Sequence, residues 1–83
     1  MYNENTQRNF IIHQLETKGF VTRNFALKYY ISRLGAIIYD LKQEGWEIDG
    51  LYNKDLIYPT SKTDYVYRLI SKPKKQKENL WLN

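Results

Sequence analysis

The chain has 83 residues, a formal net charge of +4, one histidine and no cysteine. This length fits one domain with a single modest core, and the lack of cysteine excludes disulfides and thiolate metal sites. No apolar run approaches the roughly 18 residues of a membrane span, and the first ten residues do not resemble a signal peptide. We therefore expect a cytoplasmic protein with no membrane partner and no cofactor.

The apolar spacing predicts a first helix over residues 6–18, capped at its start by Asn5 or Thr6. The positions that carry this spacing are Ile11, Ile12 and Leu15. Gly19 suits the left-handed residue that ends a helix. Residues 20–21 then form an apolar extended piece that is too short for a free strand, so we expect it to pair with a later hairpin.

Two further helices are predicted, with a short turn between them. Thr22 is a good N-cap for a helix over residues 23–29, and Ser32 is a good N-cap for a third helix that runs to Glu44 and ends at Gly45. The apolar positions of the third helix, at i, i+3, i+4 and i+7, are Leu34, Ile37, Ile38 and Leu41. Two helices in this arrangement are typical of a helix-turn-helix.

The last part of the chain predicts a β-hairpin. Residues 46–48 are a short strand candidate, and residues 63–70 alternate Tyr65, Tyr67 and Leu69 against a second, partly apolar face. Residues 49–62 are expected to form a long loop, in which residues 56–58 could extend a strand up to Pro59.

The positive charge gathers near the C-terminal end. Residues 71–78 hold four lysines against one acid, a balance of +3, so the other residues sum to only +1. We expect a folded domain over residues 1–71 and a basic, flexible tail over residues 72–83 that ends in the apolar cluster Leu80-Trp81-Leu82.

Three segments resemble winged helix-turn-helix domains of small phage and bacterial regulators. They are Gly19-Phe20-Val21-Thr22, Arg33-Leu34-Gly35-Ala36-Ile37, and the run from Leu41 to Ile48. The resemblance covers roughly residues 6–70. It implies an α+β fold, a three-helix core closed by a C-terminal β-hairpin wing, and binding of double-stranded DNA in transcription regulation.

A helix-turn-helix places the N-terminal part of its second helix in the major groove. In such a groove Arg33 could bind guanine and Gln43 adenine, while Thr22 and Arg23 could hold a phosphate at a helix start. The full set of expected DNA-binding residues is Thr22, Arg23, Lys28, Ser32, Arg33, Ala36, Tyr39, Gln43, Lys54, Lys62, Lys72, Lys74, Lys75 and Lys77. A homodimer joined through residues 80–82 would give the affinity that one helix lacks.

Plainer interpretations stay open. Arg33 could pair with Asp40 on the helix surface, and the lysine run could be a solubilising tail. The low charge outside that run also allows a protein-interaction module that docks on a host protein through its apolar wing residues, Leu51, Tyr52, Leu56, Ile57 and Tyr58. We do not expect an enzyme, because no nucleophile lies beside a base and the carboxylates are scattered.

Overall fold

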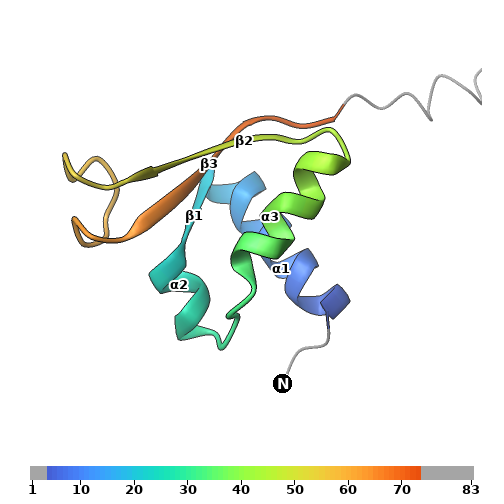
Figure 1. Ribbon diagram of the computed structural model, residues 1–83, viewed down its shortest axis with the longest axis horizontal. Helices are drawn as coiled ribbons and strands as arrows, with labels where there is room; N and C mark the ends of the chain where they lie inside the picture. The colour runs from blue at the N-terminus through green and yellow to red at the C-terminus, as the bar shows by residue number, and fades with distance from the viewer. Residues whose placement is uncertain (1–3, 74–83) are drawn as a thin grey trace, which may run out of the picture.

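The computed structural model describes residues 4–73 and shows three helices on one side of a three-stranded antiparallel sheet (Figure 1). In chain order the elements are α1 (Glu4–Lys18), β1 (Phe20–Thr22), α2 (Arg23–Lys28), α3 (Leu34–Gln43), β2 (Glu47–Tyr52) and β3 (Tyr65–Ser71). This is the expected α+β winged-helix architecture. The expected contacts of Lys74, Lys75 and Lys77, and the apolar cluster at residues 80–82, lie outside the described residues.

The first helix ends at Lys18 as predicted but begins at Glu4, so Asn5 and Thr6 lie inside it and the prediction that one of them is its N-cap is wrong. The short strand forms as predicted and runs one residue further, to Thr22. Gly19 adopts a φ of +85°, a conformation that glycine takes without steric cost, and its N–H donates to the Leu15 carbonyl at 2.9 Å. The chain then reverses into β1, which pairs antiparallel with β3. The sheet order is β1-β3-β2, so the three-residue strand is held at one edge by a partner from the far end of the fold.

The helix-turn-helix forms with small differences at its boundaries. Thr22 caps α2 as predicted, because its Oγ accepts from the Phe25 N–H at 3.0 Å. The prediction that Ser32 caps the third helix is wrong: Arg33 is the N-cap residue, and it makes no side-chain cap bond. Ile31, in the turn, and Leu34, the first residue of α3, are both buried. Residues 32 and 33 connect these two buried positions, and the helix begins after them.

The core lies between the helices and the inner face of the sheet. All four apolar positions predicted for the third helix are at most 4% exposed, and Ile11 and Leu15 of α1 are fully buried against them. Val21 of β1 and Ile48 of β2 close the same cluster from the sheet side. Each helix therefore buries one apolar stripe, which is the main source of stability in a domain of this size.

The hairpin differs most from the expectation. The second strand continues to Tyr52, so residues 49–52, expected in a loop, belong to β2 and pair with β3. Residues 56–58 do not extend a strand, and Leu56 has a φ of +55°. The loop over residues 53–64 instead lies against the outer face of the sheet, where the rings of Phe20 and Tyr58 are 4.7 Å apart.

Two buried polar residues hold this loop in place. Asn53 is 1% exposed; its side-chain amide donates to the Tyr58 and Thr60 carbonyls, and its side-chain oxygen accepts from the Tyr58 N–H at 3.0 Å. Asp64 is 2% exposed and bonds to both the loop and α2. Because buried polar groups are costly unless they are bonded, these contacts select one loop conformation.

Candidate nucleic-acid interface

The outer stripe of α3 faces away from the core along its whole length. Ala36, Tyr39 and Gln43 are exposed, as predicted, and so is the acidic Asp40. Tyr39 is 62% exposed, so most of its ring as well as its hydroxyl is available to a partner. Arg33, at the head of the helix, is half-buried. A polar, accessible helix face of this kind is what groove recognition requires.

The N-terminal half of α3 lies beside the base of the hairpin. A Cβ placed on Gly35 would lie 3.8 Å from the Tyr67 hydroxyl of β3. Gly35 and Ala36 are both exposed and carry almost no side chain, so the backbone of the helix can approach a flat or grooved partner closely. The helix and the hairpin therefore present adjoining surfaces.

Three tyrosines continue this surface along the inner face of the hairpin. The rings of Tyr67 and Tyr65 are 5.1 Å apart, and those of Tyr65 and Tyr52 are 4.9 Å apart, both edge to face. We call these three residues the tyrosine row. Gly50 makes room for it, since a Cβ there would lie 2.5 Å from the Tyr65 hydroxyl.

The alternation of Tyr65 and Tyr67 in the sequence already placed these two side chains on one face. The role of Tyr52 and Gly50 was missed, because both were assigned to a loop. Their position depends on the pairing register, Gly50 opposite Tyr67 and Tyr52 opposite Tyr65, which follows an irregularity between Glu47 and Ile48. No short-range signal in the sequence reports that register.

The exposed cation Arg23, at the start of α2, acts electrostatically on the Tyr67 hydroxyl. Burial raises the pKa of the Tyr67 hydroxyl above its ordinary value, and the positive charge of the nearby Arg23 partly offsets this effect. Tyr67 therefore stays protonated at neutral pH and keeps a hydroxyl that can donate. Arg23 is exposed at the first position of α2, so its guanidinium is accessible to a partner.

The winged helix-turn-helix domain family matches residues 6–59, which is more than half of the chain. The chain belongs to this family. No curated protein and no solved structure matches it significantly. Within the winged helix-turn-helix domain, α2 and α3 form the helix-turn-helix, α3 holds the position of the recognition helix, and the loop over residues 53–64 is the tip of the wing.

One expectation for this winged helix is wrong. The free backbone amides at the start of α2 were expected to hold a phosphate, but the Asp64 carboxylate already takes that position and accepts from the Asn24 N–H at 2.9 Å. Thr22 is 4% exposed, and its hydroxyl caps the same helix end. A buried carboxylate disfavours a second anion at this point, so any phosphate contact here has to come from the exposed side chain of Arg23.

The remaining cations are divided among several faces. Lys54 and Lys62 are exposed on the wing loop, as expected for contacts with a nucleic-acid backbone. Lys28 lies elsewhere: it lines a pocket with residues of α1 and β1, and no residue of α3 takes part. Lys72 forms an ion pair with Glu16 of α1 at 3.3 Å.

Two arginines serve the scaffold. Arg8 pairs with Glu44 and ties α1 to the end of α3. Arg68 donates two hydrogen bonds to Asp49 across the hairpin, at 2.9 and 2.7 Å. The bond from Arg68 holds the pKa of Asp49 below its ordinary value, and hydrogen bonds with Asp49 and Tyr58 raise the pKa of Arg68.

Residues 4–73 lack two features that other functions would need. No helix there is long and apolar enough to cross a bilayer. Nor does that part of the chain bring three or more histidine, cysteine, aspartate or glutamate side chains together in a way that could hold a metal ion.

Proposed function

We propose that this winged helix binds double-stranded DNA, with α3 in the major groove and the wing along the adjacent backbone. The observation that carries the proposal is the exposed, small-residue face at the start of α3, which adjoins the Tyr67 hydroxyl. Membership of a winged helix-turn-helix family supports the same assignment. A helix face next to a projecting hairpin fits a duplex better than it fits a flat partner.

The proposed roles follow from position. Arg33 and Gln43 reach base edges from the head and the end of the helix stripe, with Ser32, Ala36 and Tyr39 completing the contact surface. Arg23, Lys54 and Lys62 bind phosphates from the two sides of that stripe. The resemblance to phage and bacterial regulators supports a role in transcription control.

The first test is a fluorescence-anisotropy titration against a duplex selected from a random pool. Three phosphate contacts predict a slope of about −3 in a plot of log affinity against log salt, and Arg23→Gln should reduce that slope by about 1. Lys18→Gln removes the same charge from the pocket face and should leave the slope unchanged. Arg33→Ala should weaken the selected duplex more than a random one.

Two results would count against the groove assignment. The first is binding with no salt dependence, which would mean that no phosphates are engaged. The second is an Arg33→Ala variant that keeps full affinity for the selected sequence. Equal effects of Arg23→Gln and Lys18→Gln would show attraction by net charge without a defined interface.

A second candidate function rests on the wing tip. Leu56 is 56% exposed and Ile57 is 66% exposed. Such a patch suits a protein partner, and we propose docking on a host protein as the alternative. A gel shift with mixed duplex DNA at low salt separates the two: no shift, together with protein capture that is lost in a Leu56→Ser, Ile57→Ser variant, favours docking.

A further inference from the structure

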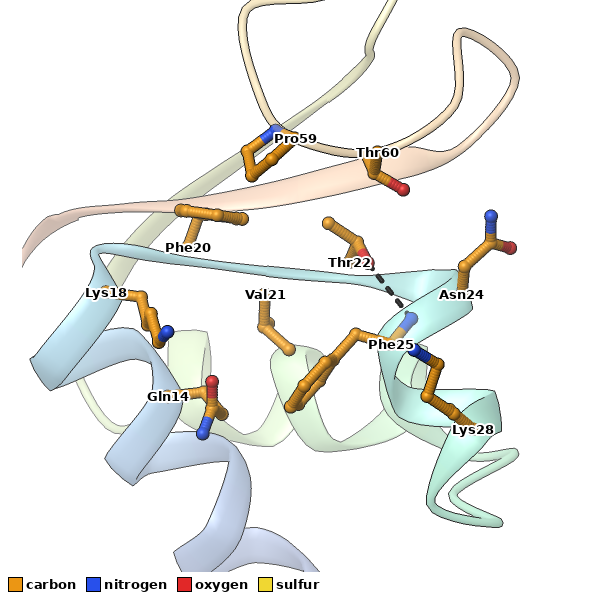
Figure 2. A pocket seen from close by; sticks show the side chains of 10 residues that line it. All are labelled: Gln14, Lys18, Phe20, Val21, Thr22, Asn24, Phe25, Lys28, Pro59 and Thr60. Carbon is orange, nitrogen blue, oxygen red and sulfur yellow. Dashed lines mark hydrogen bonds between the residues drawn. The ribbon is translucent and has the colours of Figure 1, made fainter.

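A pocket of about 240 Å³ lies along the free edge of β1, between the end of α1 and α2 (Figure 2). β1 is an edge strand, so the outer side of its backbone has no strand partner in residues 4–73. The residues that line the pocket are Gln14, Lys18, Phe20, Val21, Thr22, Asn24, Phe25, Lys28, Pro59 and Thr60. None of them belongs to α3, so the pocket is separate from the proposed DNA surface.

Two lysines stand on opposite sides of this pocket. Lys18 is the last residue of α1 and Lys28 is the last residue of α2, and both are exposed. Figure 2 shows the two side chains on opposite sides of the pocket, Lys18 at the end of α1 and Lys28 on α2. Within residues 4–73 neither lysine forms an ion pair, whereas Arg8, Arg68 and Lys72 all do. Two cations without an ion pair in residues 4–73 therefore line one pocket.

The surface between the lysines is apolar at its centre and polar at its margin. Val21 is 2% exposed, and the half-buried ring of Phe25 stands next to it (Figure 2). The side-chain amides of Gln14 and Asn24 supply donors and acceptors at the margin. This pattern, a few polar groups around an apolar surface, is typical of small-molecule sites.

We infer that this pocket binds a small organic anion with a flat apolar body, such as an aromatic carboxylate. Its volume is below the roughly 300 Å³ at which sites for drug-sized ligands begin, so a molecule of one or two rings fits. The lysines would bind the carboxylate while the ring lies against the accessible part of Phe25. Inorganic phosphate or a DNA phosphate could contact the lysines alone, and would gain nothing from the apolar surface.

The site joins four segments of the fold. A bound ligand would touch α1, β1, α2 and the wing loop at Pro59 and Thr60. The Thr60 hydroxyl donates to Asp64 at 2.6 Å, and Asp64 also binds the start of α2. A ligand in this pocket therefore contacts the same loop and helix that set the position of the wing.

The test is an NMR titration of the full chain, without DNA, in which backbone amide shifts are followed as 1-naphthoate is added. We expect saturable shifts at the residues that line the pocket. Lys18→Gln and Lys28→Gln should each weaken binding by about tenfold, the usual loss for one charged hydrogen-bonding partner. Arg23→Gln, an equal loss of charge outside the pocket, should leave the naphthoate affinity unchanged, and the spectrum of each variant reports its folding.

Two further arms identify which part of the ligand is recognised. Naphthalene-1-methanol, which keeps the rings without the charge, should bind at least about tenfold more weakly than 1-naphthoate. Inorganic phosphate should produce no saturable shift at Val21 and Phe25. Equal affinity for the neutral alcohol, equal affinity for phosphate, or unchanged binding in both lysine variants would each overturn the assignment. None of these readings depends on DNA binding.

Discussion

Replacing Gly50 by alanine tests whether the tyrosine row is held in place by the space that this glycine leaves. An added Cβ would lie 2.5 Å from the Tyr65 hydroxyl and 2.6 and 2.8 Å from two of its ring carbons, well inside van der Waals contact. The ring stands between Tyr52 and Tyr67, so it has to leave the row. We therefore expect Gly50→Ala to destabilise the fold.

The size of the effect follows from two opposing contributions. Losing two edge-to-face ring contacts costs about 1–3 kcal/mol, at about 0.5–1.5 kcal/mol each. Alanine is about 0.5–1 kcal/mol more favourable than glycine within a strand, because the unfolded chain loses less entropy on folding. The difference is a net loss of at most about 2.5 kcal/mol and centred on about 1 kcal/mol, which lowers the melting temperature of a domain of this size by several degrees.

Urea unfolding of four proteins measures this directly: the wild type, Gly50→Ala, Tyr65→Ala and the double variant. In the Tyr65→Ala background the obstacle is gone, so Gly50→Ala should become neutral or stabilising. Gly35→Ala is the matched control, because its added Cβ meets Tyr67 at an ordinary 3.8 Å within a helix. The same destabilisation by Gly50→Ala with and without the Tyr65 ring would refute the reasoning.

Three further predictions concern the wing, the hairpin and assembly. Asp64→Ala leaves the Asn24 and Tyr65 amides without their acceptor, so we expect a loss of about 2–4 kcal/mol by urea unfolding, whereas Asp55→Ala, at an exposed position of the same loop, should cost less. The pKa of Asp49 is lowered in the folded state, so its contribution to stability is present above the ordinary pKa of an aspartate and is lost as the pH falls through the lowered folded value. The difference in stability between wild type and Asp49→Asn should therefore shrink below about pH 4. A difference that stays constant with pH would contradict the ion pair. If residues 80–82 join two copies, sedimentation should give a dimer for the full chain and a monomer for a chain truncated after Ser71, and a monomeric mass in both would remove the dimer.

The helical part of the fold could be predicted because its signals are local. Apolar spacing located all three helices, and Gly19 and Thr22 marked a stop and a start that the structure confirms. The wrong N-cap prediction for α3 also has a local cause, the chemistry of Ser32. It is a better cap than Arg33 by chemistry, but the burial of Ile31 and Leu34 decides where α3 begins.

The hairpin could be predicted only in outline. Asp49 and Gly50 have the chemistry of a turn, yet they lie in β2 because β3, the last element of the fold, supplies their partners. The buried contacts of Asp64 link residues 40 positions apart and leave no periodic pattern in the sequence. For the same reason no local pattern reports that Lys18 and Lys28, from two different helices, line one pocket.

The wing loop is closed by hydrogen bonds between its own residues. The Asn53 N–H donates to the Asp64 carbonyl at 3.1 Å, so the two ends of the loop are fastened together, and the Asn53 side chain binds its interior. Because the closing bonds involve neither Lys54 nor Asp55, this exposed turn can be exchanged or lengthened at a small entropic cost. The turn at Lys54 and Asp55 can therefore be replaced by another sequence in order to change what the wing binds, provided that Asn53 and Asp64 are kept.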